Sequence, residues 1–195
     1  IIGLIKPDYG EILIENKNVT KIPIYQRCIN YGLGYCPQYG GYFNDLSIYE
    51  NLMCVAEIQI KDKSERKFRI DNLISKFELE SVVNLKAKYL SGGQRKKLVI
   101  AMALINKPKV LILDEPFAAL DILSIKMLQE IIINLQSFEN ITICVCDHQA
   151  RDLLSCVDKA IVLSNGEILA TGTPQELIQN QSAKSVYFGE KFKLN

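Results

Sequence analysis

The stretch VLILDEP, residues 110–116, decides the fold class of this 195-residue chain. Its first four residues form a continuous apolar run, which is typical of a strand buried on both faces of a sheet. The pattern then predicts a helix at about 124–138, a second buried strand at 141–146 (ITICVC) and a helix from about 149 to 156. This order of strands and helices predicts a parallel sheet with helices packed on it, an α/β fold.

The residues before this stretch combine short strands with a helical region. Strands are expected at 11–15, where apolar and polar residues alternate, and at 31–38, an apolar run closed by a proline. Three helices are expected, at 46–58, 64–79 and 94–106. We therefore expect one domain with a helical insertion at about 46–90 and a further helix that begins at 91.

The two ends of the chain carry different signals. Residues 160–172 hold two short apolar runs around Ser164-Asn165-Gly166, which predicts a β-hairpin, and Thr173 then has the pattern of a helix N-cap. At the start, Ile1 is not a methionine, and residues 1–5 resemble the last turn of a helix. We therefore expect the chain to be cut at its N terminus, after a helix that starts upstream.

Composition excludes several classes of protein. The net charge of +1 gives no global reason to expect nucleic acid or an acidic membrane as partner, and no run of eighteen apolar residues is present. The six cysteines form no C-x-x-C pair and have no zinc-ligand spacing with the one histidine. Reduced, buried cysteines in a cytosolic protein are the expectation.

The sequence Ser91-Gly92-Gly93-Gln94 opens a predicted helix. It has two interpretations, an N-cap serine with a flexible turn or an anion site formed by free N–H groups at the helix start. The basic run 95–97 opposes the helix dipole, so it is a poor choice for helix stability, whereas a phosphate in front of the helix would make it useful. Taken alone, this stretch leaves both interpretations open.

Two carboxylates end the 110–113 strand. Asp114 and Glu115 either simply face water or serve phosphoryl transfer, with Asp114 on a Mg²⁺ ion and Glu115 on an attacking water. Gln38 follows the 31–38 run, and its amide could ligate Mg²⁺ or orient water, although a surface glutamine is the simpler interpretation.

His148 follows the 141–146 strand, as Glu115 follows its own strand. Neighbouring parallel strands would bring both residues to the sheet edge at which α/β proteins bind ligands, although a lone histidine is more often structural. Asp121 lies in the loop beyond Glu115 and could reach across an interface.

Together these residues resemble the motifs of the nucleotide-binding subunits of ABC transporters, in the family's order and over nearly the whole chain. The resemblance implies the following assignments: Gln38 to the Q-loop, Leu90 to Gln94 to the signature sequence, Val110 to Glu115 to the Walker B strand, Ala119 to Asp121 to the D-loop and His148 to the switch histidine. It implies catalytic roles for Glu115, His148 and Gln38, and Mg²⁺ binding by Asp114 and Gln38. The implied fold is of the P-loop NTPase type, with an N-terminal antiparallel β portion.

The resemblance also implies cofactors and partners. ATP and Mg²⁺ would bind in a homodimer, in which Ser91 to Gln94 serve the nucleotide of the opposite subunit. Transmembrane permease subunits would dock on a groove after Gln38, for which Tyr42, Phe43 and Leu46 are the candidates, unless they simply pack in the core. The subunit would be cytoplasmic, peripheral to the inner membrane. The family's phosphate loop would precede residue 1, so we expect the 195-residue chain alone to be inactive.

Within the family, the chain most resembles ATPase subunits of lipopolysaccharide export transporters. GLGYCPQYGGYFNDLSIYENLMCV, DEPFAALD and the tail VYFGEKFKL carry this resemblance. Gln94, where an acidic residue is expected, and Ile122, where a proline is common, depart from it. ATPases of branched-chain amino acid importers are the alternative. A non-transport ABC protein, or a non-catalytic remnant that lacks the phosphate loop, are further hypotheses.

Overall fold

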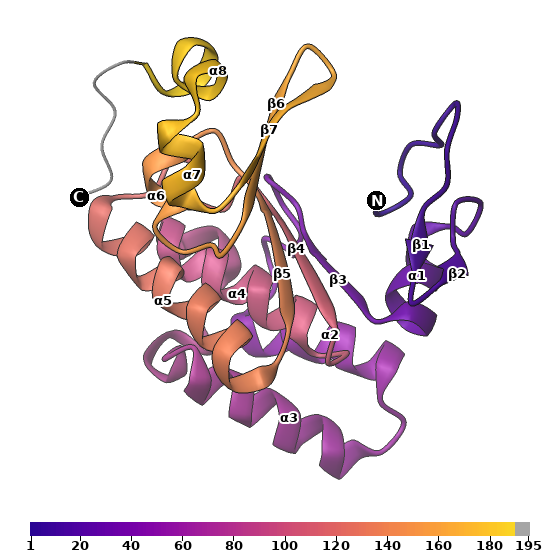
Figure 1. The fold of residues 1–195 in the computed structure, drawn as a ribbon. Coiled ribbons are helices and arrows are strands. Elements are labelled where there is room, and N and C mark those ends of the chain that lie inside the picture. Colours follow the sequence, from indigo (N-terminus) through magenta and orange to yellow (C-terminus); the bar gives the residue numbers. More distant parts are fainter. Residues whose placement is uncertain (190–195) are drawn as a thin grey trace.

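A three-stranded parallel sheet forms the centre of the molecule (Figure 1). The computed structural model describes residues 1–189, so the EKFKL part of the tail, at 190–194, lies outside the described residues. The sheet has the order β3 (Leu33–Cys36), β4 (Val110–Asp114) and β5 (Thr142–Cys146), with β4 in the middle. The register pairs each of the last two residues of β4 with a neighbour, so the carboxyl ends of all three strands lie at one edge. The predicted α/β fold with a parallel sheet is confirmed.

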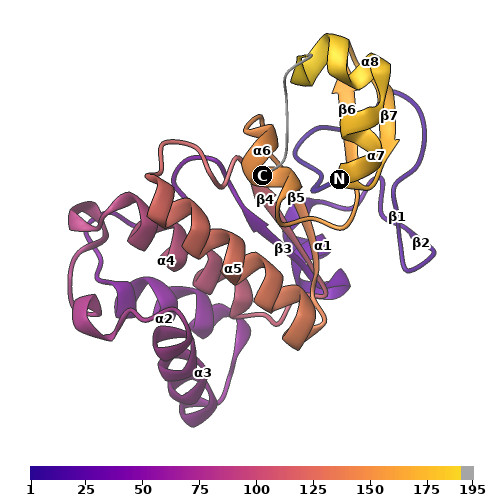
Figure 2. The same ribbon diagram turned by 60° about the vertical axis from the view of Figure 1, so that its left-hand side comes forward.

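Four helices pack in layers on one side of this sheet (Figures 1 and 2). The helix α4 (Gly92–Leu104) contacts β3, and α5 (Ile122–Glu139) contacts β5 and α4. Beyond them, α2 (Ile48–Gln59) contacts α4, and α3 (Lys63–Lys76) contacts α2. The main core between these layers includes the fully buried side chains of Leu52, Phe77, Leu98, Ile105, Leu111, Leu113, Phe117 and Leu128.

The helices begin where the sequence places capping residues. Ser47 before α2 and Ser91 before α4 each form a reciprocal capping box with the residue three positions on, Glu50 and Gln94. Each N-cap of this kind stabilises its helix by about 1 kcal/mol, because it satisfies N–H groups that have no partner in the helix. Residues 46–90 thus hold α2, α3 and two 3₁₀ turns, Glu80–Val82 and Ala87–Tyr89.

The C-terminal part builds a small second core. Strands β6 (Ala160–Ser164) and β7 (Glu167–Gly172) form the predicted antiparallel hairpin, turning at Asn165 and Gly166 with φ of 52° and 81°. The helices near it are α6 (Ala150–Leu154), α7 (Pro174–Gln179) and α8 (Gln181–Ala183), followed by a π-helical turn at Lys184–Phe188. The buried residues of this core are Leu154, Val162, Ala170, Leu177 and Ala183.

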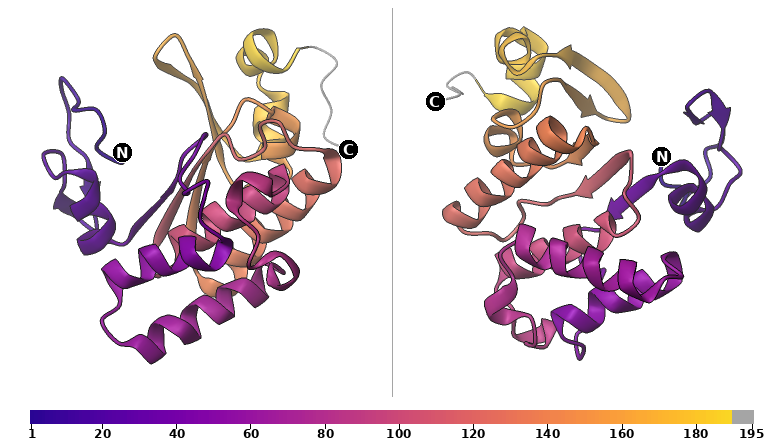
Figure 3. Two further views of the ribbon diagram at one scale, coloured as in Figure 1. Left: turned by 180° about the vertical axis from the view of Figure 1, so that it is seen from behind. Right: turned by 90° about the horizontal axis from the view of Figure 1, so that it is seen from below.

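The N-terminal segment corrects one expectation and confirms another. Residues 1–5 form no helix, because five residues close at most one helical turn and a single turn is unfavourable by itself. The antiparallel portion is present but small, β1 (Leu13–Ile14) paired with β2 (Lys17–Asn18). The pair and the helix that follows it lie beyond β3, on the side away from β5 (Figures 1 and 3).

That helix, α1 (Ile24–Tyr31), was not predicted from the sequence. Its one buried residue is a cation, Arg27, although Ile24, Cys28 and Tyr31 are half-buried and lie at helical spacing. The Arg27 guanidinium is 1% exposed and donates to the carbonyl oxygens of Ile1, Thr20 and Ile22. A buried cation therefore joins α1 to the segment before it.

A bilayer-spanning helix would need a long and strongly apolar segment. None of the helices within residues 1–189 is both long enough and apolar enough to cross a membrane.

Candidate functional site

Three side chains from three strand ends meet at one edge of the sheet. Gln38 follows β3, Glu115 follows β4, and His148 lies two residues after β5. The Gln38 amide donates from Nε2 to Glu115 Oε2 at 2.6 Å, and His148 Nδ1 lies 3.5 Å from the same oxygen. The structure therefore brings together the three residues that the sequence predicted as catalytic, at the edge where α/β sheets bind ligands.

The backbone of Glu115 has an uncommon conformation. Its φ of 42° is positive, a region that few non-glycine residues adopt and that is concentrated at functional sites. The Glu115 amide donates to Cys146 O at 2.7 Å, which holds the turn against β5. The side chain of Glu115 is 32% exposed, so its carboxylate is both held by Gln38 and accessible to solvent.

Asp114 lies one residue earlier, at the end of β4. Its Oδ2 accepts from the Tyr35 hydroxyl at 3.3 Å. Burial, and then the charge of Asp114, raise the pKa of Tyr35, so the phenol stays a proton donor to this carboxylate. The carboxylate of Asp114 and the amide oxygen of Gln38 are hard oxygen donors of the kind that Mg²⁺ prefers.

The chemistry of these donors suits an ion shared with a ligand. Among residues 1–189, no group of three or more His, Cys, Asp or Glu side chains could hold a metal by itself. Mg²⁺ is usually bound by one or two carboxylates together with substrate phosphates rather than in an all-protein cage. Asp114 and Gln38 fit that arrangement.

Asp147 joins the loop after Glu115 to the loop that carries His148, and the sequence assigned it no role. Its side chain is 0% exposed. Its Oδ2 accepts from the amide of Phe117 at 3.0 Å and its Oδ1 from the amide of Gln149 at 2.8 Å. An acid directly after an apolar run was the available signal, but its partners are main-chain groups that the sequence does not reveal.

The stretch Ser91–Gln94 is used partly within the chain. The Ser91 hydroxyl accepts from the Gln94 amide at 3.2 Å, and the Gln94 side chain accepts from the Ser91 amide at 2.9 Å. A β-carbon on Gly93 would lie 2.9 Å from Ser124 Oγ, and one on Gly92 would lie 3.2 Å from Leu120 Cδ2. The glycines therefore let the start of α4 approach the start of α5 closely, whatever else binds there.

The lysines of the basic run after this stretch have partners within the chain. Lys96 Nζ donates to two main-chain carbonyls, Gln38 O at 3.3 Å and Glu115 O at 3.2 Å, and Lys97 pairs with Glu78 at 3.3 Å. Both lysines thus have partners within the chain, and the interpretation of 95–97 as cations near a phosphate stays a prediction.

Asp121 is the N-cap of α5. Its carboxylate accepts from the Ser124 amide at 3.0 Å and from the Ser124 hydroxyl at 2.6 Å, and these hydrogen bonds lower the pKa of Asp121. The residue thus has a structural role on its own helix. A contact across an interface stays a prediction.

The candidates for the partner groove differ in exposure. Tyr42 is half-buried against the main core, Leu46 is half-buried, and Phe43 is 57% exposed. The fully buried Asn51 holds their loop, accepting from the Phe43 amide at 2.7 Å and donating to the Phe43, Leu46 and Ser47 carbonyls. Phe43 is therefore the most available of the three for a partner.

Comparison with known proteins identifies the family. Residues 1–118, more than half of the chain, match the family model described as "ABC transporter". The chain belongs to the ABC transporter ATP-binding family. This ABC protein is 37% identical over 196 residues to the "Lipopolysaccharide export system ATP-binding protein LptB" of Haemophilus influenzae. The aligned region covers 100% of this chain and 80% of that protein. The predicted resemblance to the export subunits is confirmed.

Solved structures agree with this assignment. The ABC protein is 27% identical to cbiO1 of Clostridium perfringens, described as part of the ABC transporter complex cbiONQ, with a TM-score of 0.82 over 94% of this chain and 74% of that chain. It is 25% identical to the ATP-binding cassette MJ0796, with a TM-score of 0.76 over 88% of this chain and 76% of that chain. That structure is described as dimeric, in a post-hydrolysis state bound to ADP and Pi.

Proposed function

We propose that this ABC protein is the ATP-hydrolysing subunit of a transporter that exports lipopolysaccharide from the inner membrane. The observation that supports hydrolysis is the contact of two side chains with one oxygen of the Glu115 carboxylate. Gln38 Nε2 lies 2.6 Å from Glu115 Oε2, and His148 Nδ1 lies 3.5 Å from it. The cargo is supported by the lipopolysaccharide export system to which the relative that is 37% identical over the whole chain belongs. The subunit would act at the cytoplasmic side of the membrane, bound through partners.

In the proposed reaction, Glu115 takes a proton from the water that attacks the terminal phosphate. The Gln38 amide holds the carboxylate of Glu115 in place, and the exposed ring of His148 is free to contact the phosphate. Asp114 and the amide oxygen of Gln38 would hold Mg²⁺, which neutralises charge on the phosphate oxygens. Gln38 suits both tasks because an amide has donors and a separate acceptor oxygen.

The proposed assembly is a homodimer with transmembrane permease subunits. Ser91 to Gln94 would bind the nucleotide of the opposite subunit through N–H groups at the start of α4, and Asp121 would reach across the same interface. Tyr42, Phe43 and Leu46 would receive a segment of the permease, with exposed Phe43 as the main contact. The dimeric, ADP-bound structure of the related cassette supports this arrangement.

The catalytic assignment is tested by Glu115→Gln in the protein as its gene encodes it. We expect kcat to fall by about 100-fold or more, because an amide takes no proton from water, while the Kd for ATP changes by less than about twofold. Steady-state phosphate release and calorimetry measure the two quantities. Glu130→Gln, a change at an exposed glutamate on α5, is the matched control. Near-normal hydrolysis by Glu115→Gln would remove Glu115 from the role of base.

The cargo is tested in vesicles that contain the protein and its transmembrane partners. ATP-dependent release of labelled lipopolysaccharide is the expected result, and it should disappear with Glu115→Gln. Accumulation of a branched-chain amino acid in place of lipopolysaccharide release would assign the protein to the importers.

A further inference from the structure

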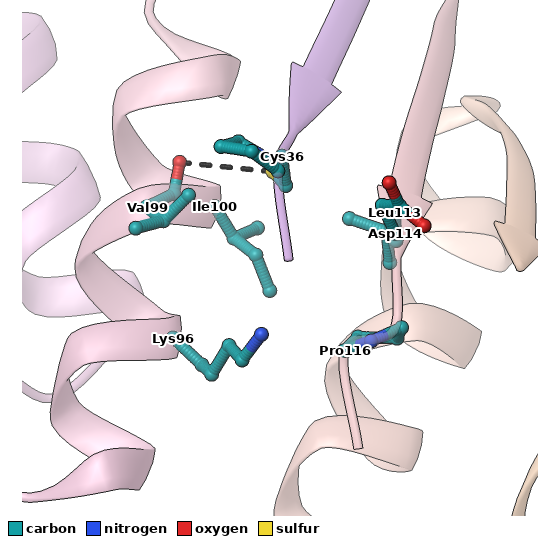
Figure 4. Close-up of a pocket in the computed structure, with 8 residues that line it drawn as sticks. Cys36, Lys96, Val99, Ile100, Leu113, Asp114 and Pro116 are labelled. Atoms are coloured by element: carbon teal, nitrogen blue, oxygen red, sulfur yellow. Dashed lines mark hydrogen bonds between the residues drawn. The ribbon is translucent and has the colours of Figure 1, made fainter. Parts of the chain in front are cut away.

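Lys96 is a charged side chain that the proposed chemistry leaves unused. It projects from α4 into a small pocket between the ends of β3 and β4, which is also lined by Cys36, Leu113 and Asp114 (Figure 4). From there Nζ donates to Gln38 O at 3.3 Å and to Glu115 O at 3.2 Å. One ammonium group thus binds main-chain oxygens that lie on two different strand ends.

Burying the Lys96 ammonium costs free energy, and its hydrogen bonds to the two carbonyls offset that cost. Burial lowers the pKa of Lys96, and the neighbouring acidic groups, Cys36 first and then Asp147, Asp114 and Glu115, counter that effect only partly. The ion pairs found among residues 1–189 do not include Lys96, so carbonyl oxygens rather than a carboxylate hold its ammonium. A partly buried cation is stable only where hydrogen bonds replace its lost water.

The two carbonyls belong to the residues whose side chains form the shortest contact of the site. Gln38 Nε2 and Glu115 Oε2 are 2.6 Å apart, and their main chains are joined through the Lys96 ammonium. Hydrogen bonds from a charged donor are stronger than those between neutral groups. Fixing both main chains therefore fixes both ends of the Gln38–Glu115 hydrogen bond.

We propose that Lys96 is a positioning residue that holds the Gln38 and Glu115 loops at the distance hydrolysis requires, so that α4 braces the catalytic pair of its own subunit. Its importance for rate rests on the proposed function, whereas its effect on the two loops does not. Gln94, which lies one half-turn before Lys96 on α4, belongs to the stretch proposed to bind the opposite nucleotide. The first turn of α4 would therefore bind the nucleotide of the opposite subunit. The second turn of α4, which carries Lys96, would support hydrolysis of the nucleotide in its own subunit.

The first test follows the two loops by hydrogen exchange in the full chain. The Glu115 amide is bonded to Cys146 O and the Phe117 amide to Asp147 Oδ2, so both report on the loop after β4. In Lys96→Met we expect these amides to exchange about tenfold faster, with α3 and the β6–β7 hairpin unchanged. Lys97→Met is the matched control, because Lys97 pairs with the exposed Glu78 and should leave both amides unchanged.

The second test is kinetic and uses the protein as its gene encodes it. Because a misplacement of about 1 Å costs roughly 100-fold in rate, Lys96→Met should lower kcat by about that factor and change KM for ATP by less than about twofold. Lys96→Arg, which retains a charged donor, should recover most of kcat. A merely structural lysine would not produce this separation of kcat from KM together with rescue.

The outcomes separate the two proposals. Unchanged exchange at Glu115 and Phe117 in Lys96→Met, or faster exchange throughout the fold, overturns the role of Lys96 whether or not ATP is hydrolysed. If Lys96→Met does not fold, Lys96→Gln, a neutral donor, replaces it in both tests with the same criteria. Failure of the unmodified protein to hydrolyse ATP, with exchange changed only at the loops, overturns the proposed function and leaves the bracing role supported.

Discussion

At the scale of single residues, the site depends on groups that act through main-chain atoms. Asp147 is fully buried and accepts from the amides of Phe117 and Gln149, and Lys96 donates to the carbonyls of Gln38 and Glu115. These two side chains of opposite charge bind three of the loops around the sheet edge. The side chains that meet there are thus held by neighbours that do not take part in the proposed reaction.

Cys36, beside Lys96, makes stability depend on pH. Burial raises the pKa of the Cys36 thiol to about 12 from the ordinary value of 9.0, so the folded protein keeps the proton after the unfolded chain has lost it. Below pH 9 the thiol is protonated in both states, so it does not change the free energy of unfolding with pH. As pH rises from 9 toward 12, only the unfolded chain loses the proton, and the free energy of unfolding falls by up to about 1.4 kcal/mol per pH unit.

Between pH 9 and 10, we therefore expect the free energy of unfolding of Cys36→Ala to fall by about 1 kcal/mol less than that of the unmodified protein. Urea unfolding at the two pH values measures this difference, and each protein serves as its own reference at pH 8. Equal slopes in the two proteins would show that Cys36 titrates normally in the folded state.

At the scale of elements, the contact between the starts of α4 and α5 leaves no room for a side chain at Gly93. A β-carbon there would lie 2.9 Å from Ser124 Oγ and 3.4 Å from Ser124 Cβ. Real β-carbons almost never approach to the shorter distance, so either the Ser124 hydroxyl must rotate, which breaks its hydrogen bond to Asp121, or one helix must shift. Alanine usually stabilises a helix by about 1 kcal/mol relative to glycine, and here the clash opposes that gain.

Gly93→Ala is expected to lower the free energy of unfolding by about 1–3 kcal/mol, because overpacking outweighs helix propensity. Removing the facing hydroxyl in Gly93→Ala with Ser124→Ala should recover more than half of that loss. Urea denaturation of the two single variants and the double variant forms a double-mutant cycle. A Gly93→Ala protein as stable as the unmodified one would refute the contact.

At the scale of the whole molecule, the proposed function requires two copies. Residues 91–94, at the start of α4, form no hydrogen bond or ion pair with Gln38, Glu115 or His148 among those found in residues 1–189. The related cassette that was solved in a dimeric state bound to ADP and Pi supports the proposal that two copies act together.

We expect ATP to convert the Glu115→Gln protein, as its gene encodes it, from monomer to dimer, because bound ATP that is not hydrolysed keeps the interface closed. Adding Ser91→Arg should prevent the dimer, since a bulky cation blocks the start of α4. Sedimentation velocity with and without ATP measures both. An ATP-dependent dimer that persists in the double variant would place the interface elsewhere.

Local patterns in the sequence determined much of this architecture. The apolar runs before Asp114 and before Asp147 became β4 and β5, and Thr173 became the N-cap that its pattern predicted. Such signals are readable because they depend on residues within a few positions of each other. The order of strands and helices then placed Gln38, Glu115 and His148 at one edge.

Tertiary structure alone decided the features that join distant residues. Arg27 joins α1 to the preceding segment by donating to carbonyls of Thr20 and Ile22, and Lys96 donates to carbonyls at two strand ends. Gly93 lies against Ser124, where the helices α4 and α5 contact each other. A sequence pattern records which side chains are charged or small. Their partners depend on how the helices pack, which only the folded chain specifies.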